Sequence, residues 1–182
     1  MLKPPDDDQF LCQHAMELTA MISFVRGANS ILEIGSRYGQ TLLHLASNAN
    51  PTARIVTVDI GDCPDKLKDK GIQTHLWWDE ACDELRKTRD LHQIYGDSHN
   101  PDTVERVRAL GPYDFVMIDG DHSLGGCRAD WDNYGQMGRM VVFHDTRCVP
   151  DVAQVFQYAR YGKLSIELTA LNGYGIGVIY NG

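Results

Sequence analysis

The chain has 182 residues and a formal net charge of −8; 43% of its residues are hydrophobic and 23% are charged. This length and hydrophobic share suit one globular domain and exclude a disordered chain. No apolar stretch is long enough to cross a membrane, and Lys and Arg cluster only in short runs such as residues 66–70. We therefore expect no membrane and no nucleic acid as partner.

Cysteine usage and the first residues bear on the compartment. The five cysteines are odd in number and scattered, and none form a C-x-x-C pair. This pattern argues against a disulfide framework and against a structural zinc site. Residues 1–8 lack the apolar segment of a secretory signal peptide. We expect a protein of the reducing cytoplasm.

Apolar residues with helical spacing over residues 6–26 predict an amphipathic helix at the start of the chain. Strand-like and helical patterns then alternate, which indicates a parallel sheet with helices on both faces. The expected strands are 30–35, 54–60, 91–96, 113–119, 139–144, 164–170 and 174–180. The expected helices lie near 39–48, 78–89, 101–110, 124–134 and 150–161.

The last two expected strands break this alternation. Only Asn172 and Gly173, with their neighbours, separate them, and so short a connection permits only an antiparallel hairpin. The predicted fold class is α/β: a Rossmann-like, seven-stranded, mostly parallel sheet with an antiparallel C-terminal strand and helices on both faces. We expect one domain, residues 1–182, in which the N-terminal helical segment 1–28 packs on the core.

The loop after the first expected strand is the most informative segment. The apolar strand that carries Glu33 runs into Gly35, Ser36 and Gly39, and a helical pattern follows. A strand that breaks at glycine and restarts as a helix presents free backbone N–H groups, and glycines let a ligand approach them closely. The spacing is E-x-G-x-x-x-G, so the middle glycine of the dinucleotide fingerprint is missing. This loop favours a nucleoside with an amino-acid-like tail over a dinucleotide.

Asp59 ends the next buried strand, about 20 residues on, where a Rossmann-type site keeps its ribose-binding acid. Its carboxylate can accept hydrogen bonds from both ribose hydroxyls. With the glycine loop before it, this acid makes the chain resemble the class I S-adenosylmethionine-dependent methyltransferases. A purely structural interpretation stays open, in which the two glycines make a tight turn and Asp59 caps the next helix.

Ligands of open parallel sheets bind outside the carboxyl ends of the strands, so the residues that end each strand are informative. Asp97 and Ser98 follow the third expected strand; the Asp can accept from an adenine amino group and the Ser can bond a ring nitrogen. Either residue could instead cap the turn before Asn100. The resemblance implies S-adenosyl-L-methionine as cofactor, and we assign to its binding Glu33, Gly35, Ser36, Gly39, Asp59, Asp97, Ser98 and Asp119.

Segments 113–122 and 140–146 point to one group within the class I methyltransferases. They resemble the small-molecule O-methyltransferases related to macrocin O-methyltransferase and the cephalosporin-hydroxylase-like proteins. In that group an acid ending the fourth strand and an acid pair ending the fifth bind a divalent metal, and the matching residues here are Asp119, His144 and Asp145. The resemblance implies Mg²⁺ or Mn²⁺. The imidazole of His144, where an acid or amide is more usual, favours Mn²⁺, Fe²⁺ or Zn²⁺ over Mg²⁺.

Metal-assisted methyl transfer also needs a base that removes the proton of the acceptor. Asp121 and His122 follow the expected metal acid, and the resemblance makes Asp121 the leading catalytic base with His122 second. In the alternative interpretation, Asp121 caps the helix that starts near Leu124 and His122 hydrogen-bonds locally.

We predict an S-adenosylmethionine-dependent methyltransferase that methylates a hydroxyl of a small-molecule acceptor with the help of a divalent metal, with a homodimer as a candidate assembly. Two other functions stay open. One is a methyltransferase-fold protein that binds the cofactor without catalysis. The other is a metal-dependent hydrolase that uses Asp119, His144 and Asp145. The glycine loop and Asp59 favour cofactor binding over the hydrolase.

Overall fold

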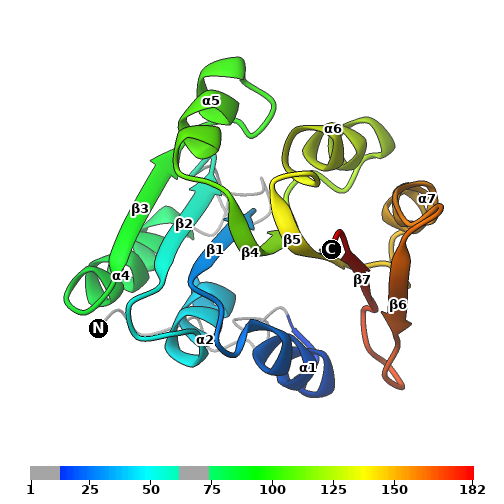
Figure 1. Cartoon of the computed structure of the whole chain (residues 1–182), viewed down its shortest axis with the longest axis horizontal. Helices are drawn as coiled ribbons and strands as arrows, with labels where there is room; N and C mark the ends of the chain where they lie inside the picture. The colour runs from blue at the N-terminus through cyan, green and yellow to red at the C-terminus, as the bar shows by residue number, and fades with distance from the viewer. Residues whose placement is uncertain (1–12, 62–73) are drawn as a thin grey trace.

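The computed structural model describes residues 13–61 and 74–182, which form a seven-stranded sheet with the strand order β3-β2-β1-β4-β5-β7-β6 (Figure 1). This sheet confirms the predicted α/β fold class. The strands are β1 (Ser30–Ile34), β2 (Arg54–Asp59), β3 (Asp90–Tyr95), β4 (Tyr113–Ile118), β5 (Gly138–His144), β6 (Leu164–Leu168) and β7 (Ile176–Tyr180).

Helices cover both faces of the sheet, as expected (Figure 1). One buried apolar cluster joins the sheet to α5 (Pro101–Ala109), α6 (Leu124–Tyr134) and α7 (Pro150–Ala159). A second cluster joins the opposite face to α1 (Ala15–Val25), α2 (Gln40–Asn48) and α4 (Thr74–Arg86). Because both faces are covered, the central strands are mostly apolar, which is the pattern of a buried parallel sheet.

The direction of the strands places the binding edge of the sheet. Strands β1 to β5 pair in parallel, whereas β7 is antiparallel to both β5 and β6. The order reverses at β1, with β2 and β3 on one side and β4 and β5 on the other. Open α/β sheets bind ligands at such a switch point, outside the carboxyl ends of the strands. The loops after β1 and β4 therefore face each other where a ligand is expected.

All the expected strands and helices occur, with shifted ends. Helix α1 starts at Ala15 in the described part of the chain, and residues 6–12 of the expected helix lie outside it. Helix α4 starts at Thr74, before the expected residue 78. Strand β7 starts at Ile176 rather than residue 174, because its preceding backbone N–H groups bond to α1 instead of a neighbouring strand.

Glu17 of α1 makes that bond. Its buried carboxylate accepts the backbone N–H of Tyr174 at 3.2 Å and that of Gly175 at 2.7 Å. The turn between β6 and β7 fits closely around it, since a Cβ atom on Gly173 would lie 2.3 Å from Glu17 Oε1. One carboxylate thus ties the N-terminal helix to the C-terminal hairpin.

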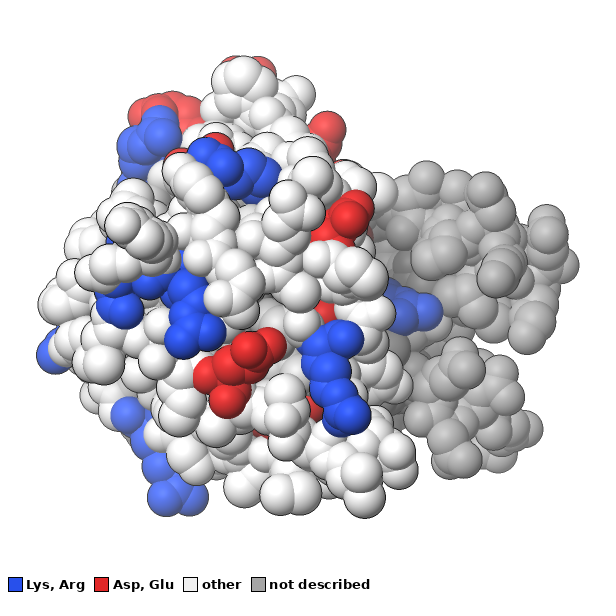
Figure 2. Space-filling view, turned by 90° about the vertical axis from the view of Figure 1, so that its right-hand side faces the viewer, with Lys and Arg blue, Asp and Glu red and all other residues white. Residues whose placement is uncertain are grey.

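The surface on the side of α7 and β6 is mostly uncharged, with Lys, Arg, Asp and Glu scattered over it (Figure 2). Leu164 of β6 and Tyr161 just before it are largely exposed there. Among the residues that the structure describes, no helix has the length and apolar character needed to cross a membrane.

Replacing Glu17 by Ala should lower the free energy of unfolding by roughly 2–4 kcal/mol, because one buried and one partly buried N–H group lose their acceptor. Chemical denaturation measures this change. Glu105→Ala, which removes an exposed glutamate of α5, is the control and should cost less than about 0.5 kcal/mol. Equal stability of wild type and Glu17→Ala would contradict the role of this contact.

Candidate active site

The loop after β1 is held by close contacts that require glycine. Gly35 and Gly39 have left-handed backbone conformations, with φ of 89° and 74°. A Cβ atom on Gly35 would lie 2.1 Å from the backbone oxygen of Asp119, and one on Gly39 would lie 2.8 Å from Cβ of Ala81. The tight-turn interpretation is therefore confirmed for both glycines. The turn also brings the β1 loop directly against the carboxyl end of β4.

Glu33 lies beneath this loop. Its side chain is buried, and the Ser36 hydroxyl donates to Glu33 Oε2 at 2.5 Å. Ser36 also bonds the hydroxyl of Thr57, which accepts from Trp78 Nε1 at 3.1 Å. Burial raises the pKa of Glu33 to about 8, and the hydrogen bond from Ser36 opposes that rise only in part. Glu33 is thus mostly protonated at neutral pH and anchors the loop from below.

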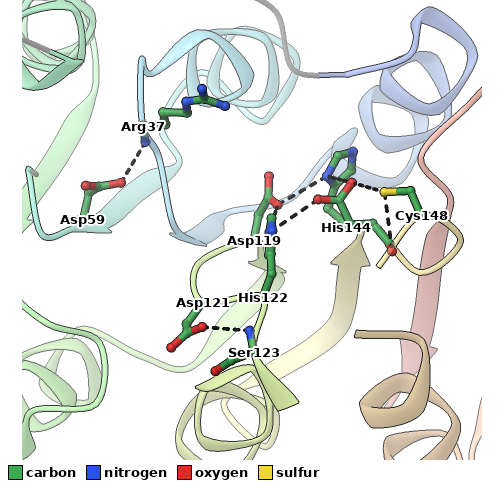
Figure 3. A network of polar contacts seen from close by, with 9 residues as sticks. Arg37, Asp59, Asp119, Asp121, His122, Ser123, His144 and Cys148 are labelled. Carbon is green, nitrogen blue, oxygen red and sulfur yellow. Dashed lines mark hydrogen bonds and ion pairs between the residues drawn. The ribbon is translucent and has the colours of Figure 1, made fainter. Parts of the chain in front are cut away.

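Asp59, at the end of β2, holds the same loop from the side. Its two oxygens accept the backbone N–H groups of Arg37 and Gly61, each at 2.8 Å (Figure 3 draws the first). A carboxylate has about four lone-pair sites, so these bonds leave acceptor capacity. Asp59 also lines the cleft described below. It can therefore order the loop and accept from a ligand at the same time.

The loop after β3 is ordered by its own hydrogen bonds. Asp97 Oδ1 accepts the backbone N–H of His99 at 2.8 Å, and the Tyr134 hydroxyl donates to the Ser98 carbonyl at 2.6 Å. Asp97 thus closes the turn before Asn100, as the alternative interpretation expected, whereas Asn100 itself caps α5. Asp97 and Ser98 still line the cleft, so their polar groups are held ready for a ligand.

Two carboxylates and two imidazoles converge at the ends of β4 and β5 (Figure 3). We call Asp119, His122, His144 and Asp145 the acid–histidine cluster. His144 Nδ1 lies 3.3 Å from Asp119 Oδ1 and 3.2 Å from Asp145 Oδ1. His122 Nε2 lies 3.2 Å from the same Asp119 oxygen and 3.4 Å from Asp145 Oδ2. Ligand atoms of Asp119, His122 and Asp145 lie within 4.8 Å of one another, close enough to share a metal ion.

The charges in this cluster depend on one another. Burial disfavours a charged His144, but Asp119 and Asp145 outweigh it and raise the pKa of His144 to about 10. Burial would raise the pKa of Asp119, but His144 and His122 hold it below its usual range. The hydrogen bond to Asp119 raises the pKa of His122. The cluster therefore favours a positive charge between its two carboxylates.

The donor set fits a divalent cation. His144 is buried, and neither of its ring nitrogens makes a hydrogen bond of good geometry, although Nδ1 lies at ion-pair distance from both carboxylates. A buried nitrogen directed between two carboxylates is well placed to bind a shared cation instead of a proton. The mixture of imidazole and carboxylate suits Mn²⁺ or Zn²⁺ better than Mg²⁺.

A local backbone turn directs Asp145 into the cluster. Asp145 has a left-handed φ of 64°, which Asp tolerates better than most residues. Its carbonyl accepts the N–H of Val149, and its Oδ1 accepts the thiol of Cys148 at 3.1 Å. Burial and then Asp145 raise the pKa of Cys148 to about 12, so the thiol stays protonated and donates.

Asp121 lies apart from the cluster. Its Oδ1 accepts the backbone N–H of Ser123 at 2.8 Å, and Ser123 is the residue that caps α6. Burial would raise the pKa of Asp121, but the hydrogen bonds from Ser123 hold it below its usual range. In Figure 3 its carboxylate points away from His144, whereas His122 points toward the cluster. Of the two predicted bases, His122 is the one that the structure places among the predicted metal residues.

A cleft of about 830 Å³ joins these parts. Glu33 and Gly39 do not line it, because they support the β1 loop from beneath and behind. The other predicted residues do line it: Gly35, Ser36, Asp59, Asp97, Ser98, Asp119, Asp121, His122, His144 and Asp145. The cleft thus brings the predicted cofactor residues and the predicted metal residues into one continuous space.

Among the other residues that line the cleft are Gln13, His99 and Tyr174, for which the sequence indicated no role. Gln13 is buried, and in the described part of the chain neither atom of its amide has a hydrogen-bond partner. The Tyr174 ring lies 5.5 Å from the His144 ring. No local pattern could have shown Gln13 and Tyr174, since Gln13 precedes α1 and Tyr174 belongs to the distant β6–β7 turn, whereas His99 directly follows the predicted residues Asp97 and Ser98.

Solved structures of methyltransferases share this fold. An O-methyltransferase from Bacillus cereus in complex with SAH is 15% identical, with a TM-score of 0.64 over 99% of this chain and 94% of that chain. The O-methyltransferase TomG from Streptomyces achromogenes, in complex with SAM, is 18% identical, with a TM-score of 0.63 over 92% and 80%. The N-methyltransferase NodS from Bradyrhizobium japonicum, in complex with S-adenosyl-L-homocysteine, is 13% identical, with a TM-score of 0.63 over 96% and 87%. At these identities the likeness establishes the fold.

The family is established by sequence. No curated protein matches this chain. A protein-family model described as a methyltransferase domain, however, matches residues 32–146, which is more than half of the chain and includes both the β1 loop and the acid–histidine cluster. The chain therefore belongs to the methyltransferase-domain family.

Proposed function

We propose that this protein transfers a methyl group from S-adenosylmethionine to a hydroxyl oxygen of a small molecule, with the help of a divalent cation. The observation that carries the proposal is that one cleft contains both the β1 loop with Asp59 and the acid–histidine cluster. A hydrolase would have no use for the nucleoside half. A protein that only binds the cofactor would have no use for the cluster.

The cofactor half lies along the loops after β1, β2 and β3. In the proposed complex, Gly35 and Ser36 present the backbone to the amino-acid tail, Asp59 accepts from the ribose hydroxyls, and Asp97 and Ser98 meet the adenine. The acids around the cleft also complement the positive sulfonium, since opposite charges attract strongly where water is partly excluded.

In the other half, Asp119, Asp145 and His144 would hold the cation. A bound cation lowers the pKa of a hydroxyl and stabilises the oxyanion that results. The methyl donor already carries a good leaving group, so the protein mainly has to align the acceptor and take up one proton.

His122 is the base in this proposal. Its side chain is 42% exposed, so it can pass a proton to solvent, whereas His144 is only 3% exposed and cannot. As the acceptor oxygen attacks the methyl carbon, its proton moves to His122. The bond between sulfur and the methyl group breaks with its electron pair on sulfur, which leaves a neutral S-adenosylhomocysteine. Asp121 is the alternative base.

The division of the chain as a single domain, residues 1–182, remains our proposal, as do a cytoplasmic location and a homodimer. The acceptor is proposed only as a small molecule with a hydroxyl group. Similar folds serve O- and N-methyltransferases, so the fold does not select the acceptor atom. The acid–histidine cluster is what favours oxygen here.

Asp59→Ala should weaken S-adenosylhomocysteine binding at least tenfold, because hydrogen bonds to a charged group contribute about 1.5–3 kcal/mol each. Isothermal titration calorimetry measures the affinity. Asp59→Asn keeps an acceptor but loses the charge, so its affinity for S-adenosylhomocysteine should lie between those of the wild type and Asp59→Ala. Asp102→Ala removes an exposed acid of α5 and should bind as wild type does. An unchanged affinity in Asp59→Ala would remove the cofactor half of the proposal.

Mn²⁺ should raise the melting temperature of the wild type by about 5 °C or more at a hundredfold excess over its Kd. The double variant Asp119→Asn, Asp145→Asn should lose most of this shift. Asp132→Asn, an exposed acid of α6, should keep it. If none of Mn²⁺, Mg²⁺ and Zn²⁺ shifts the wild type, the protein does not use a divalent cation.

His122→Gln should lower turnover by about 10²–10⁴-fold, the usual contribution of a general base. The same variant should keep its affinity for S-adenosylhomocysteine and its Mn²⁺ shift. A screen of phenols, catechols and sugar hydroxyls first supplies an acceptor. A large loss in Asp121→Asn with an active His122→Gln would assign the base to Asp121. Loss of the Mn²⁺ shift in His122→Gln would make His122 a metal ligand.

A further inference from the structure

Gln13 is a buried polar residue of the cleft to which the proposed reaction gives no role. Only 6% of it is exposed, and in the described part of the chain neither its amide oxygen nor its amide nitrogen has a hydrogen-bond partner. Unpaired groups of this kind cost free energy, so the buried amides of folded proteins are nearly always paired. Because Gln13 lines the cleft, a molecule bound there can supply both partners.

The start of α1 fixes the place of Gln13. The next residue, His14, caps this helix, and its Nδ1 accepts the backbone N–H of Met16 at 3.3 Å. In the first turn of the same helix, Glu17 accepts the backbone N–H of Tyr174 at 3.2 Å. Figure 1 accordingly shows α1 beside the β6–β7 hairpin. Gln13 and Tyr174 therefore belong to the same end of the cleft.

The order of the strands shows which end this is. Along the sheet, β3, β2 and β1 carry the loops proposed for the cofactor, and β4 and β5 carry the acid–histidine cluster. Strand β7 comes next and is antiparallel to β5, so its first residue, Ile176, pairs with His144. Tyr174 precedes it, and its ring lies 5.5 Å from the His144 ring. This end therefore lies beyond the cluster from the cofactor, on the side left for the acceptor.

We propose that Gln13 and Tyr174 form an acceptor subsite that selects phenols carrying a neutral amide group. Tyr174 is 42% exposed, so its ring can pack against the planar ring of a phenol while Gln13 pairs with the amide. The inference rests on the proposed function, which puts the methyl donor and the cation on the other side of this subsite. It deepens that function by naming the class of acceptor.

The choice of an amide follows from the two groups that Gln13 leaves unpaired. Its side chain offers N–H hydrogens and an acceptor oxygen, and a primary amide offers the same groups in the same geometry. Two such amides pair side by side through two hydrogen bonds. A carboxylate can only accept, so it would leave Gln13 Oε1 unpaired and place it against a negative oxygen. Sites built to hydrogen-bond an N–H group discriminate strongly against analogues that lack it.

Calorimetric titration of the full chain, saturated with S-adenosylhomocysteine and Mn²⁺, tests the subsite. The ligands are the meta and para isomers of hydroxybenzamide, of methyl hydroxybenzoate and of hydroxybenzoate. For at least one isomer, the wild type should bind the amide at least about tenfold more tightly than the carboxylate, because the amide pairs both groups of Gln13. The neutral ester can accept but not donate, and it should also bind more weakly than the amide. The ester thus separates hydrogen bonding from charge.

Gln13→Leu should abolish the preference for the amide. Its melting temperature should equal or exceed that of the wild type, because an apolar side chain replaces a buried amide without a partner. A merely structural Gln13 would instead make this variant less stable. Gln154→Leu, which replaces an exposed glutamine of α7, is the matched control and should keep the preference. Tyr174→Leu should weaken the binding of all these phenols and leave their ratio unchanged.

The outcomes separate this inference from the function on which it rests. A wild type that fails to bind S-adenosylhomocysteine or Mn²⁺ would overturn the proposed function. A wild type that binds both, but binds none of these phenols or shows no preference for the amide, would overturn the subsite alone. The same preference in wild type and Gln13→Leu, or a lower melting temperature of Gln13→Leu, would also overturn the subsite.

Discussion

The crossing of the β1 loop over the end of β4 is the contact on which the rest of the site depends. Gly35 runs so close to the Asp119 backbone that a Cβ atom would overlap its oxygen, at 2.1 Å. Asp119 N–H also donates to Ile34 O, so the two strand ends are joined on both sides of the crossing. Ser36, next in the loop, is anchored to Glu33 below. One backbone contact thus sets the separation between the proposed methyl donor and the acid–histidine cluster.

Many acids surround this cleft, and each is stabilised in a different way. Glu33 is buried and mostly protonated, because its pKa is raised to about 8. Asp59 and Asp97 accept backbone N–H groups. Asp119 and Asp145 face two imidazoles. In the last arrangement two imidazoles lie between two carboxylates that both line the cleft, which is why we assign the cation there.

The sequence predicts the sheet well because buried strands are continuous apolar runs whose ends carry the polar residues. Glu33, Asp59, Asp97, Asp119 and Asp145 could be found in this way, and the structure brings all but Glu33 to one cleft. The start of β7 was predicted two residues too early. Strand β7 is shortened by Glu17, a contact across 157 positions of the chain that no local pattern reveals.

The directions of the side chains could not be predicted from the sequence either, because they depend on hydrogen bonds that no local pattern reveals. Asp121 and His122 are neighbours in the chain, but Ser123 takes the carboxylate of Asp121 while His122 turns toward Asp119. The left-handed backbone of Asp145 likewise depends on a local turn without a motif. Identity and spacing predict which residues gather at the sheet edge; hydrogen bonds decide what each of them does.

A crystal structure of the protein with S-adenosylhomocysteine and Mn²⁺ tests the central claim most directly. The account predicts the nucleoside along Asp59 and Asp97, its sulfur facing the acid–histidine cluster, and an anomalous peak for Mn²⁺ between Asp119 and Asp145. A nucleoside bound elsewhere, or a Mn²⁺ peak remote from the sulfur, would contradict a single cleft that joins the methyl donor to a metal-held acceptor.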